Sequence, residues 1–157
     1  MNASPVIEIS LPDEAEMHVF GGRLAKILES GDVIALYGDL GAGKTTLSRG
    51  LIRALTSPDT EVPSPTYTLV QTYDTEKGEL WHFDLYRVEH PSELTELGYY
   101  DALEDICVIE WPEHAGTLLP DDRLSLHISI DGSGRRVQLM SGNDHWIRRL
   151  KDEFDSD

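Results

Sequence analysis

The segment at residues 38–46, GDLGAGKTT, combines residue types that together can bind a chain of phosphates. Gly38 and Gly43 stand five positions apart, and Lys44 and Thr45 follow directly. Glycine permits positive φ and lets backbone N–H groups come close to an anion. A lysine ammonium at this place can contact the β and γ phosphates, and a hydroxyl group can coordinate Mg²⁺. This is the Walker A pattern, and it predicts that the loop binds a nucleoside triphosphate.

The segments on either side of this loop fit the structural context that the motif requires. VIALY, residues 33–37, is an apolar run typical of a buried parallel strand, and Leu47, Leu51 and Leu55 have helical spacing. The helix would begin near Lys44 and direct the positive end of its dipole at the phosphates. A glycine-rich turn that matches by chance is the alternative, and the order of strand, loop and helix argues against it. We therefore expect ATP or ADP to be bound by the loop residues Gly38, Asp39, Leu40, Gly41, Ala42, Gly43, Lys44, Thr45 and Thr46.

The composition limits the classes of protein to which the chain can belong. Residues 1–157 are enough for one domain with a single core, and nothing indicates a second domain. With 29 Asp and Glu against 13 Lys and Arg, the surface would repel a nucleic-acid backbone, so we do not expect direct, unaided binding to nucleic acid. The chain has no long apolar run and no basic, apolar leader, which predicts a cytoplasmic protein without a membrane span. Cys107 lies in the apolar run ICVI, which predicts a buried thiol without a chemical role.

Hydrophobic patterns predict the elements that surround the loop. An amphipathic helix with Met17, Phe20 and Leu24 on its apolar side precedes the strand at 33–37, and its acidic start at 12–14 could lie near the base of the nucleotide. Two hairpins would add antiparallel strands to an otherwise parallel sheet. We therefore predict an α/β protein with a P-loop NTPase fold, in three layers, with a mixed, mostly parallel central sheet. The other predicted elements are strands at 6–10, 67–73, 79–85, 123–130 and 135–141, one or two short helices within 90–105, and a helix at 143–154.

Two acidic residues follow segments that are predicted to be strands. Asp84 comes after ELWHF, and Glu110 comes after ICVI, the cleaner apolar run because His82 interrupts the other. An acid at the carboxyl end of a strand can hold Mg²⁺ or orient a water molecule in a P-loop ATPase. Either acid alone could be an ordinary surface residue, but ligands of an open α/β sheet bind beyond these strand ends. Which acid contacts the metal stays open, and His82, beside two aromatic residues, is interpreted as structural.

The loop PSPTY, residues 63–67, is stiff because Pro63 and Pro65 flank Ser64. One interpretation is a simple entry into the following strand. The other is a switch segment in which the hydroxyl of Ser64 or Thr66 contacts the γ-phosphate or its metal, because the ordering of such a loop is a common way to sense the nucleotide state. The residues alone leave both interpretations open.

Features of other P-loop proteins are missing from the sequence. A GTPase would need a guanine-reading loop of the NKxD type, and SGND at residues 141–144 does not match it. A small-molecule kinase usually needs an arginine-rich lid over the phosphates, whereas the arginines of this chain are spread thinly. A compact ATPase or a nucleotide-gated module remains.

Five sequence blocks, in this order and spacing, resemble the TsaE (YjeE) family of bacterial ATPases: GDLGAGKTTLSRG, PSPTYTLVQTY, HFDLYR, ELGYYD and ICVIEWPE. The resemblance covers about residues 8–130, most of the chain. It implies an accessory ATPase in the formation of threonylcarbamoyladenosine beside the anticodon of tRNA. The family acts there with the TsaB and TsaD proteins, and ATP hydrolysis supports repeated turnover. TsaD transfers the threonylcarbamoyl group, so contact with the tRNA would be indirect, through the complex.

The resemblance also implies roles for individual residues. Residues 38–45 would bind the phosphates, with Lys44 acting in catalysis and with Thr45 and Glu110 associated with Mg²⁺. Asp84 of the HFDLYR block is similar to an acid needed for hydrolysis, and Thr66 of the SPTY block is similar to a switch threonine. The alternative is a nucleotide-gated assembly module, in which ATP occupancy rather than hydrolysis controls the complex.

Overall fold

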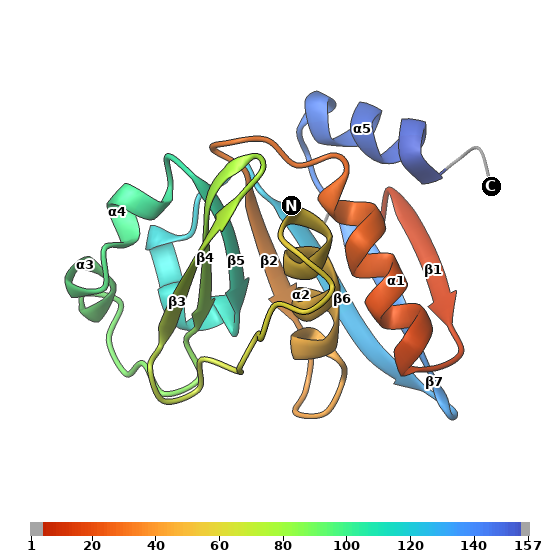
Figure 1. The fold of residues 1–157 in the computed structure, drawn as a ribbon, viewed down its shortest axis with the longest axis horizontal. Coiled ribbons are helices and arrows are strands. Elements are labelled where there is room, and N and C mark those ends of the chain that lie inside the picture. The colour runs from red at the N-terminus through yellow and green to blue at the C-terminus, as the bar shows by residue number, and fades with distance from the viewer. Residues whose placement is uncertain (1–4, 155–157) are drawn as a thin grey trace.

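The computed structural model describes residues 5–154, which form a seven-stranded sheet with helices on both of its faces (Figure 1). The strands lie in the order β1-β7-β6-β2-β5-β4-β3. Their bounds are β1 (Ile7–Leu11), β2 (Val33–Tyr37), β3 (Val70–Thr75), β4 (Gly78–Asp84), β5 (Ile106–Glu110), β6 (Leu124–Asp131) and β7 (Gly134–Met140). The strand that precedes the Walker A loop therefore lies at the centre of the sheet, as its apolar sequence requires.

The middle of the sheet is parallel and its margins are antiparallel. β2 pairs in parallel with β5 on one side and with β6 on the other, and β5 pairs in parallel with β4. Tight turns join β3 to β4 and β6 to β7, so these neighbours are antiparallel, and β1 adds an antiparallel pair to β7. The predicted P-loop NTPase fold with a mixed sheet is confirmed, with the parallel pairs in its centre.

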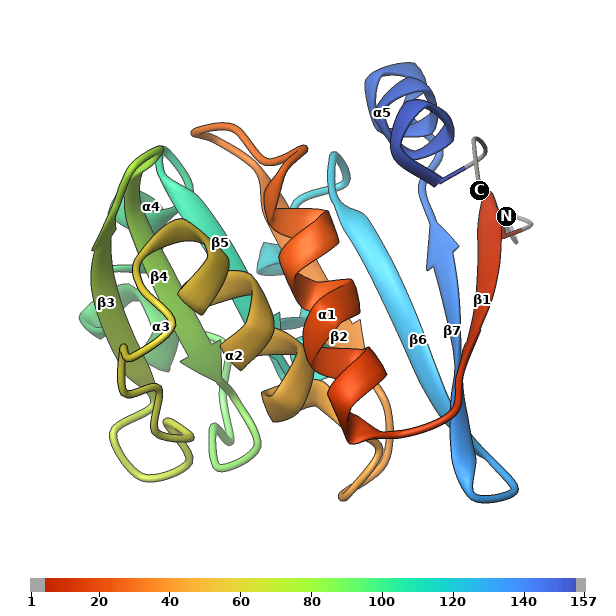
Figure 2. The same ribbon diagram turned by 45° about the vertical axis from the view of Figure 1, so that its right-hand side comes forward.

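Helices on the two faces complete the three predicted layers (Figures 1 and 2). α1 and α2 lie side by side on one face, α5 packs against α1 through the rings of Phe154 and Phe20, and α3, α4 and η1 cover β4 and β5 on the other face. The bounds are α1 (Glu14–Ala25), α2 (Lys44–Leu55), α3 (Glu93–Glu96), α4 (Tyr99–Ala102), η1 (Pro112–Leu118) and α5 (Asp144–Phe154). Within residues 5–154, no helix is both long and apolar enough to cross a membrane.

α1 and α2 approach each other closely because each has a glycine at the contact. A Cβ atom at Gly21 would lie 2.2 Å from the carbonyl oxygen of Leu47, and one at Gly50 would lie 2.0 Å from that of His18. Since backbone atoms cannot give way at such distances, a larger residue at either position would push the helices apart. This packing fixes the position of α2, whose amino end adjoins the Walker A loop.

The strands next to the loop are buried on both faces. In β2, Ile34 and Leu36 belong to the apolar core beneath α1 and α2, whereas Val33 belongs to the core beneath α3 and α4. In β5, Cys107 lies in the second core, where burial raises the pKa of its thiol to about 12. The predicted buried cysteine is thus confirmed, and two packed layers hold the strand ends that carry the site.

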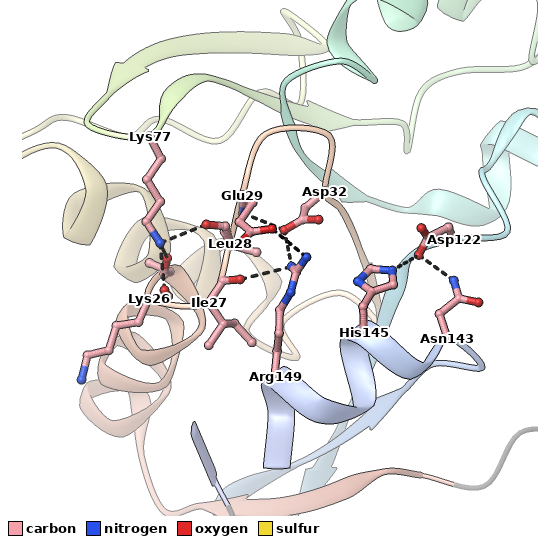
Figure 3. A network of polar contacts seen from close by, with 11 residues as sticks. Lys26, Ile27, Leu28, Glu29, Asp32, Lys77, Asp122, Asn143, His145 and Arg149 are labelled. Carbon is pink, nitrogen blue, oxygen red and sulfur yellow. Dashed lines mark hydrogen bonds and ion pairs between the residues drawn. The ribbon is translucent and has the colours of Figure 1, made fainter. Parts of the chain in front are cut away.

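A network of hydrogen bonds and ion pairs lies at the end of the sheet opposite the Walker A loop (Figure 3). Lys77, in the turn between β3 and β4, donates hydrogen bonds to three carbonyl oxygens at the C-terminal end of α1, at 2.8–3.1 Å. Arg149 of α5 donates to the carboxylates of Asp32 and Glu29 at 2.7 and 2.9 Å. The network joins α1, α5 and the segment before β2, and its charged groups have partners within the protein.

The first hairpin differs from the sequence prediction at its start. Its first strand begins at Val70 and not at Tyr67, because the chain from Pro65 to Leu69 forms a turn. The N–H of Leu69 donates to the carbonyl oxygen of Pro65 at 2.7 Å, and Leu69 has a φ of 71°. The sequence pattern does not reveal this turn, because polar and apolar side chains alternate in the turn as they do in the strand that follows. As a result, Thr66 lies outside the sheet.

Candidate nucleotide and metal site

The Walker A loop connects the carboxyl end of β2 to the amino end of α2, at the lower end of the sheet in Figure 1. Gly41 and Gly43 have φ of 81° and 116°, in the region that favours glycine. Gly43 is also the N-cap of α2 and has no side chain with which to cap the helix. The N–H groups of the first turn of α2 are therefore left for another acceptor, which is the arrangement that binds phosphate at a helix amino end.

Lys44, in the first turn of α2, turns back over this loop. Its Nζ donates to the carbonyl oxygens of Gly38 and Asp39, the latter at 3.1 Å, and lies 4.0 Å from the ring centre of Trp111. Burial lowers the pKa of Lys44, and carboxylates nearby, with that of Glu110 as the strongest, act in the opposite direction. The Lys44 ammonium is thus bound by two neutral carbonyl oxygens of the loop, and phosphate oxygens could take the place of these acceptors.

Glu110 ends β5 and connects two elements of the site. Its Oε1 accepts a hydrogen bond from the Thr45 hydroxyl at 3.1 Å, and its Oε2 lies 2.6 Å from Nε2 of His82. The side chain of Glu110 is almost fully buried, and each of its two oxygens contacts one protein group. Thr45 and Glu110, the two residues predicted to associate with Mg²⁺, are in direct contact.

Asp84 ends β4, and its position in the parallel register is opposite Glu110. Its Oδ2 accepts from the Thr66 hydroxyl at 3.2 Å, and its Oδ1 accepts from the backbone N–H of Tyr86 at 3.0 Å. The Thr66 hydroxyl also lies 2.9 Å from that of Ser64. Ser64 and Thr66 of the PSPTY loop are therefore linked, one through the other, to the acid at the end of β4.

One cleft of about 240 Å³ brings these side chains together. It is lined by all five residues to which a catalytic or metal role was assigned in the sequence, namely Lys44, Thr45, Thr66, Asp84 and Glu110. The chain from residue 5 to 154 contains no group of three or more His, Cys, Asp or Glu side chains that could hold a metal ion by themselves. A divalent ion here would use the Thr45 hydroxyl, a carboxylate and oxygen atoms from a ligand, which suits Mg²⁺ because this ion usually binds through few protein groups and substrate phosphates.

A second cavity, of about 380 Å³, lies on the other side of the Walker A loop. It shares Gly41, Gly43 and Thr46 with the first cleft, and it extends to Met17 of α1 and to Arg135 of β7. Arg135 donates to the carbonyl oxygens of Ala42 and Gly41 at 3.0 and 3.2 Å. Asp13 and Glu14, at the acidic start of α1, also line this cavity.

Sequence reasoning missed two residues of this region. No role was assigned to Arg135, which reaches the loop from a position 93 residues later in the chain, and His82 was interpreted as structural only. The signal that could have indicated His82 is its spacing from Asp84, because two residues apart on a strand means the same face of the sheet. No comparable signal exists for Arg135, since its contact depends on the tertiary fold.

These features define the class of protein. A glycine-rich Walker A loop lies between a helix and the central strand β2, which pairs in parallel on both sides, and acids occupy the carboxyl ends of β5 and β4. The chain has a P-loop NTPase fold.

Comparisons with known proteins identify the family. Residues 11–137 match the family model described as Threonylcarbamoyl adenosine biosynthesis protein TsaE. The tRNA threonylcarbamoyladenosine biosynthesis protein TsaE of Haemophilus influenzae is 39% identical over 138 residues, which cover 83% of this chain and 87% of that protein. The protein of the same name from Aquifex aeolicus is 40% identical over 134 residues, covering 84% and 94%. The chain belongs to the TsaE family, as its sequence blocks predicted.

A solved structure supports the fold independently. The crystal structure of YdiB from Bacillus subtilis superposes with a TM-score of 0.76 at 24% sequence identity, covering 96% of this chain and 95% of that one. The likeness therefore extends over nearly the whole chain and includes β7 and α5, which lie beyond all five characteristic sequence blocks.

Proposed function

We propose that this protein is a Mg²⁺-dependent ATPase that supports threonylcarbamoyladenosine modification of tRNA. The observation that carries the proposal is the cleft in which Lys44, Thr45, Thr66, Asp84 and Glu110 converge beside a glycine-rich helix amino end. Membership of the TsaE family, with relatives that are named for this modification, supplies the biological setting. ATP and ADP are the proposed nucleotides, and Mg²⁺ the proposed metal.

Each side chain of the cleft has a role in this proposal. Lys44 would exchange its carbonyl partners for β and γ phosphate oxygens, and the N–H groups at the start of α2 would bind the same phosphates. Thr45 and Glu110 would hold Mg²⁺, which neutralises charge that develops on the phosphates. Asp84 would orient the attacking water, and Thr66, already bonded to Asp84, would respond to the γ phosphate.

The charges of the cleft explain why the metal would be needed. Lys44 is surrounded by the carboxylates of Glu110, Glu113, Asp84 and Asp39, so acids outnumber this cation. A triphosphate alone would be repelled by these groups, whereas its Mg²⁺ complex brings positive charge to them. We therefore expect nucleotide affinity to depend strongly on Mg²⁺.

The base and ribose would occupy the second cavity. This cavity continues from the phosphate cleft across Gly41, Gly43 and Thr46, and it combines the apolar side chain of Met17 with polar groups, as small-molecule sites do. Met17 is 1% exposed, and its replacement by Ala should weaken ADP binding in folded protein. The variant Leu24→Ala, at a buried apolar position of the same helix outside the cavity lining, is the matched control and should leave the affinity unchanged.

Partner proteins are part of the proposal. The formal net charge of −16 argues against unaided tRNA binding, so contact with tRNA would be indirect, through the TsaB and TsaD proteins. The test is ATP hydrolysis by the purified protein, alone and with these partners. Slow hydrolysis alone and faster hydrolysis with the partners would support the proposal, and equal rates would contradict coupling to the complex.

The Asp84→Asn variant tests the chemical step. It should bind ADP with Mg²⁺ as the unsubstituted protein does but hydrolyse ATP at least about a hundredfold more slowly, because positioned acid or base groups typically contribute that much. Unchanged hydrolysis would reject the role of Asp84.

A nucleotide-gated assembly module is the second candidate function. The observation that favours it is the chain of hydrogen bonds from Ser64 through Thr66 to Asp84, which connects an exposed loop to the cleft. A non-hydrolysable ATP analogue separates the two candidates. If the analogue supports repeated rounds of tRNA modification, occupancy is sufficient and the second candidate is correct.

A further inference from the structure

His82 lies behind the acid to which we assign the metal. This histidine of β4 is completely buried, and its Nε2 lies 2.6 Å from Oε2 of Glu110, whose side chain is 3% exposed. The other ring nitrogen, Nδ1, is buried and has no hydrogen-bond partner among the described residues. His82 therefore makes a single side-chain hydrogen bond in this structure, and that bond is to Glu110.

The contact indicates where the proton lies. A neutral imidazole carries its proton on one nitrogen, and the other nitrogen is an acceptor. If Nδ1 carried the proton, the acceptor lone pair of Nε2 would face a carboxylate, and an N–H group would be buried without an acceptor. With the proton on Nε2, this nitrogen donates to Glu110, and only an acceptor remains unpaired. Since a hydrogen bond to an ionised group is stronger than a neutral one, this tautomer accounts for the contact.

The hydrogen bond also fixes the orientation of the carboxylate. With Oε2 of Glu110 held by His82, Oε1 faces the Thr45 hydroxyl at 3.1 Å. Without His82, the carboxylate could turn toward the ammonium of Lys44, whose pKa it raises more than any other carboxylate does. Such an ion pair would compete with the phosphates for Lys44 and with the metal for Glu110.

We propose that His82 is a positioning residue, which donates from Nε2 to Glu110 and so directs Oε1 of this acid toward Thr45 and the metal. The inference rests on the proposed function, in which Thr45 and Glu110 hold Mg²⁺. β4 then supplies two residues to the site on one face: His82, which contacts Glu110, and Asp84, which is opposite Glu110 in the register. Groups that orient a metal ligand in this way typically contribute about ten- to a hundredfold to metal affinity.

Two substitutions test the role of the donor. His82→Phe keeps an aromatic ring, somewhat larger than imidazole, without a donor, and His82→Gln offers an amide N–H near the position of Nε2. We expect His82→Phe to raise the Mg²⁺ concentration for half-maximal ADP binding in calorimetry by about tenfold, with unchanged ADP affinity in EDTA. His82→Gln should recover most of this loss. An unchanged Mg²⁺ requirement in folded His82→Phe would overturn the proposal, as would an equal loss in both variants.

A control and a second measurement make the outcome independent of folding. His90→Gln, at an exposed position outside the cleft, should behave as the unsubstituted protein does. In the unsubstituted protein, long-range ¹H–¹⁵N NMR of the histidine rings should show His82 with its proton on Nε2, and Glu110→Gln should shift this signal. A proton on Nδ1 alone would overturn the proposal. The NMR measurement needs no nucleotide, so it tests the contact even if the proposed ATPase function fails.

Discussion

Two lysines of this protein donate hydrogen bonds to backbone carbonyl oxygens, one at each end of the sheet. Lys77 holds three carbonyl oxygens where α1 ends, at the negative end of the helix dipole. Lys44 holds the carbonyl oxygens of Gly38 and Asp39 beside a cleft, where burial lowers its pKa and four carboxylates lie near it. The bonds are chemically alike, but the surroundings differ: Lys77 completes a closed network, whereas Lys44 adjoins a space in which it can change partners.

The two ends also differ in what their acids do. Asp32 and Glu29 are paired with Arg149 in the network of Figure 3, where the guanidinium provides the positive charge. Glu110 and Asp84 bind only hydroxyl groups, a backbone N–H and a histidine ring. The acids of the network are thus in direct contact with a guanidinium, whereas Glu110 and Asp84 line the cleft beside Lys44, where the proposed Mg²⁺ would bind.

The largest expected effect is that of Lys44→Ala on nucleotide binding. Loss of the ammonium removes the charged contact to the phosphates, so ADP affinity in the presence of Mg²⁺ should fall at least about a hundredfold, since charged contacts of this kind contribute several kcal/mol. Thermal unfolding of the nucleotide-free protein should change little, because the lost hydrogen bonds are to carbonyl oxygens at a cleft. Lys77→Ala is the matched control and should retain its ADP affinity. Equal binding by Lys44→Ala and the unsubstituted protein would contradict the comparison.

Arg149→Met should have the largest effect on stability. It leaves Asp32, which is 7% exposed, without its cation, and burial already raises the pKa of this acid. We expect a loss of about 2–3 kcal/mol in the free energy of unfolding by urea, less than for a fully buried pair because the Arg149 side chain is 22% exposed. Arg148→Met, at an exposed position next to it, is the control. A loss of ADP affinity in Arg149→Met would show that the two ends of the sheet are not independent.

Lys77→Met should have a smaller effect of the same kind. Three hydrogen bonds from a charged donor are lost, but water can reach part of the exposed helix end, so we expect a loss of about 1–2 kcal/mol in the free energy of unfolding. Lys26→Met, whose side chain is exposed in the same region, should change it by less than about 0.5 kcal/mol. If the two variants are equally stable, the carbonyl contacts of Lys77 contribute nothing.

The smallest expected effect is that of Cys107 on the pH dependence of stability. Cys107 lies on β5, the strand that ends at Glu110. Burial raises the pKa of its thiol from 9.0 to about 12. Below pH 9 the thiol is protonated in both states, and between about pH 9 and 12 the unfolded state releases its proton first, so stability falls as the pH rises. The loss of stability from about pH 9 to 11 should be smaller in Cys107→Ala. Rapid reaction of the native thiol with an alkylating reagent at about pH 8 would contradict this assignment.

Residues that act through local sequence were predictable, and residues that act through the register of the sheet were not. The Walker A loop, Asp84 and Glu110 follow apolar runs directly, so their place at strand ends could be inferred from neighbouring residues. The bond between His82 and Glu110 joins two strands and depends on which residues of β4 and β5 are opposite each other. The contact of Arg135 with the Walker A loop likewise depends on tertiary packing. The turn at Leu69 depends on one backbone dihedral, the positive φ of this residue.

The most direct test of the central claim is a crystal structure of the protein with Mg²⁺ and a non-hydrolysable ATP analogue. The account predicts triphosphate density at the amino end of α2, Lys44 Nζ on phosphate oxygens in place of the Gly38 and Asp39 carbonyls, and a metal ion beside Thr45 and Glu110. Nucleotide bound elsewhere, or Lys44 still on the two carbonyl oxygens with the analogue present, would contradict it.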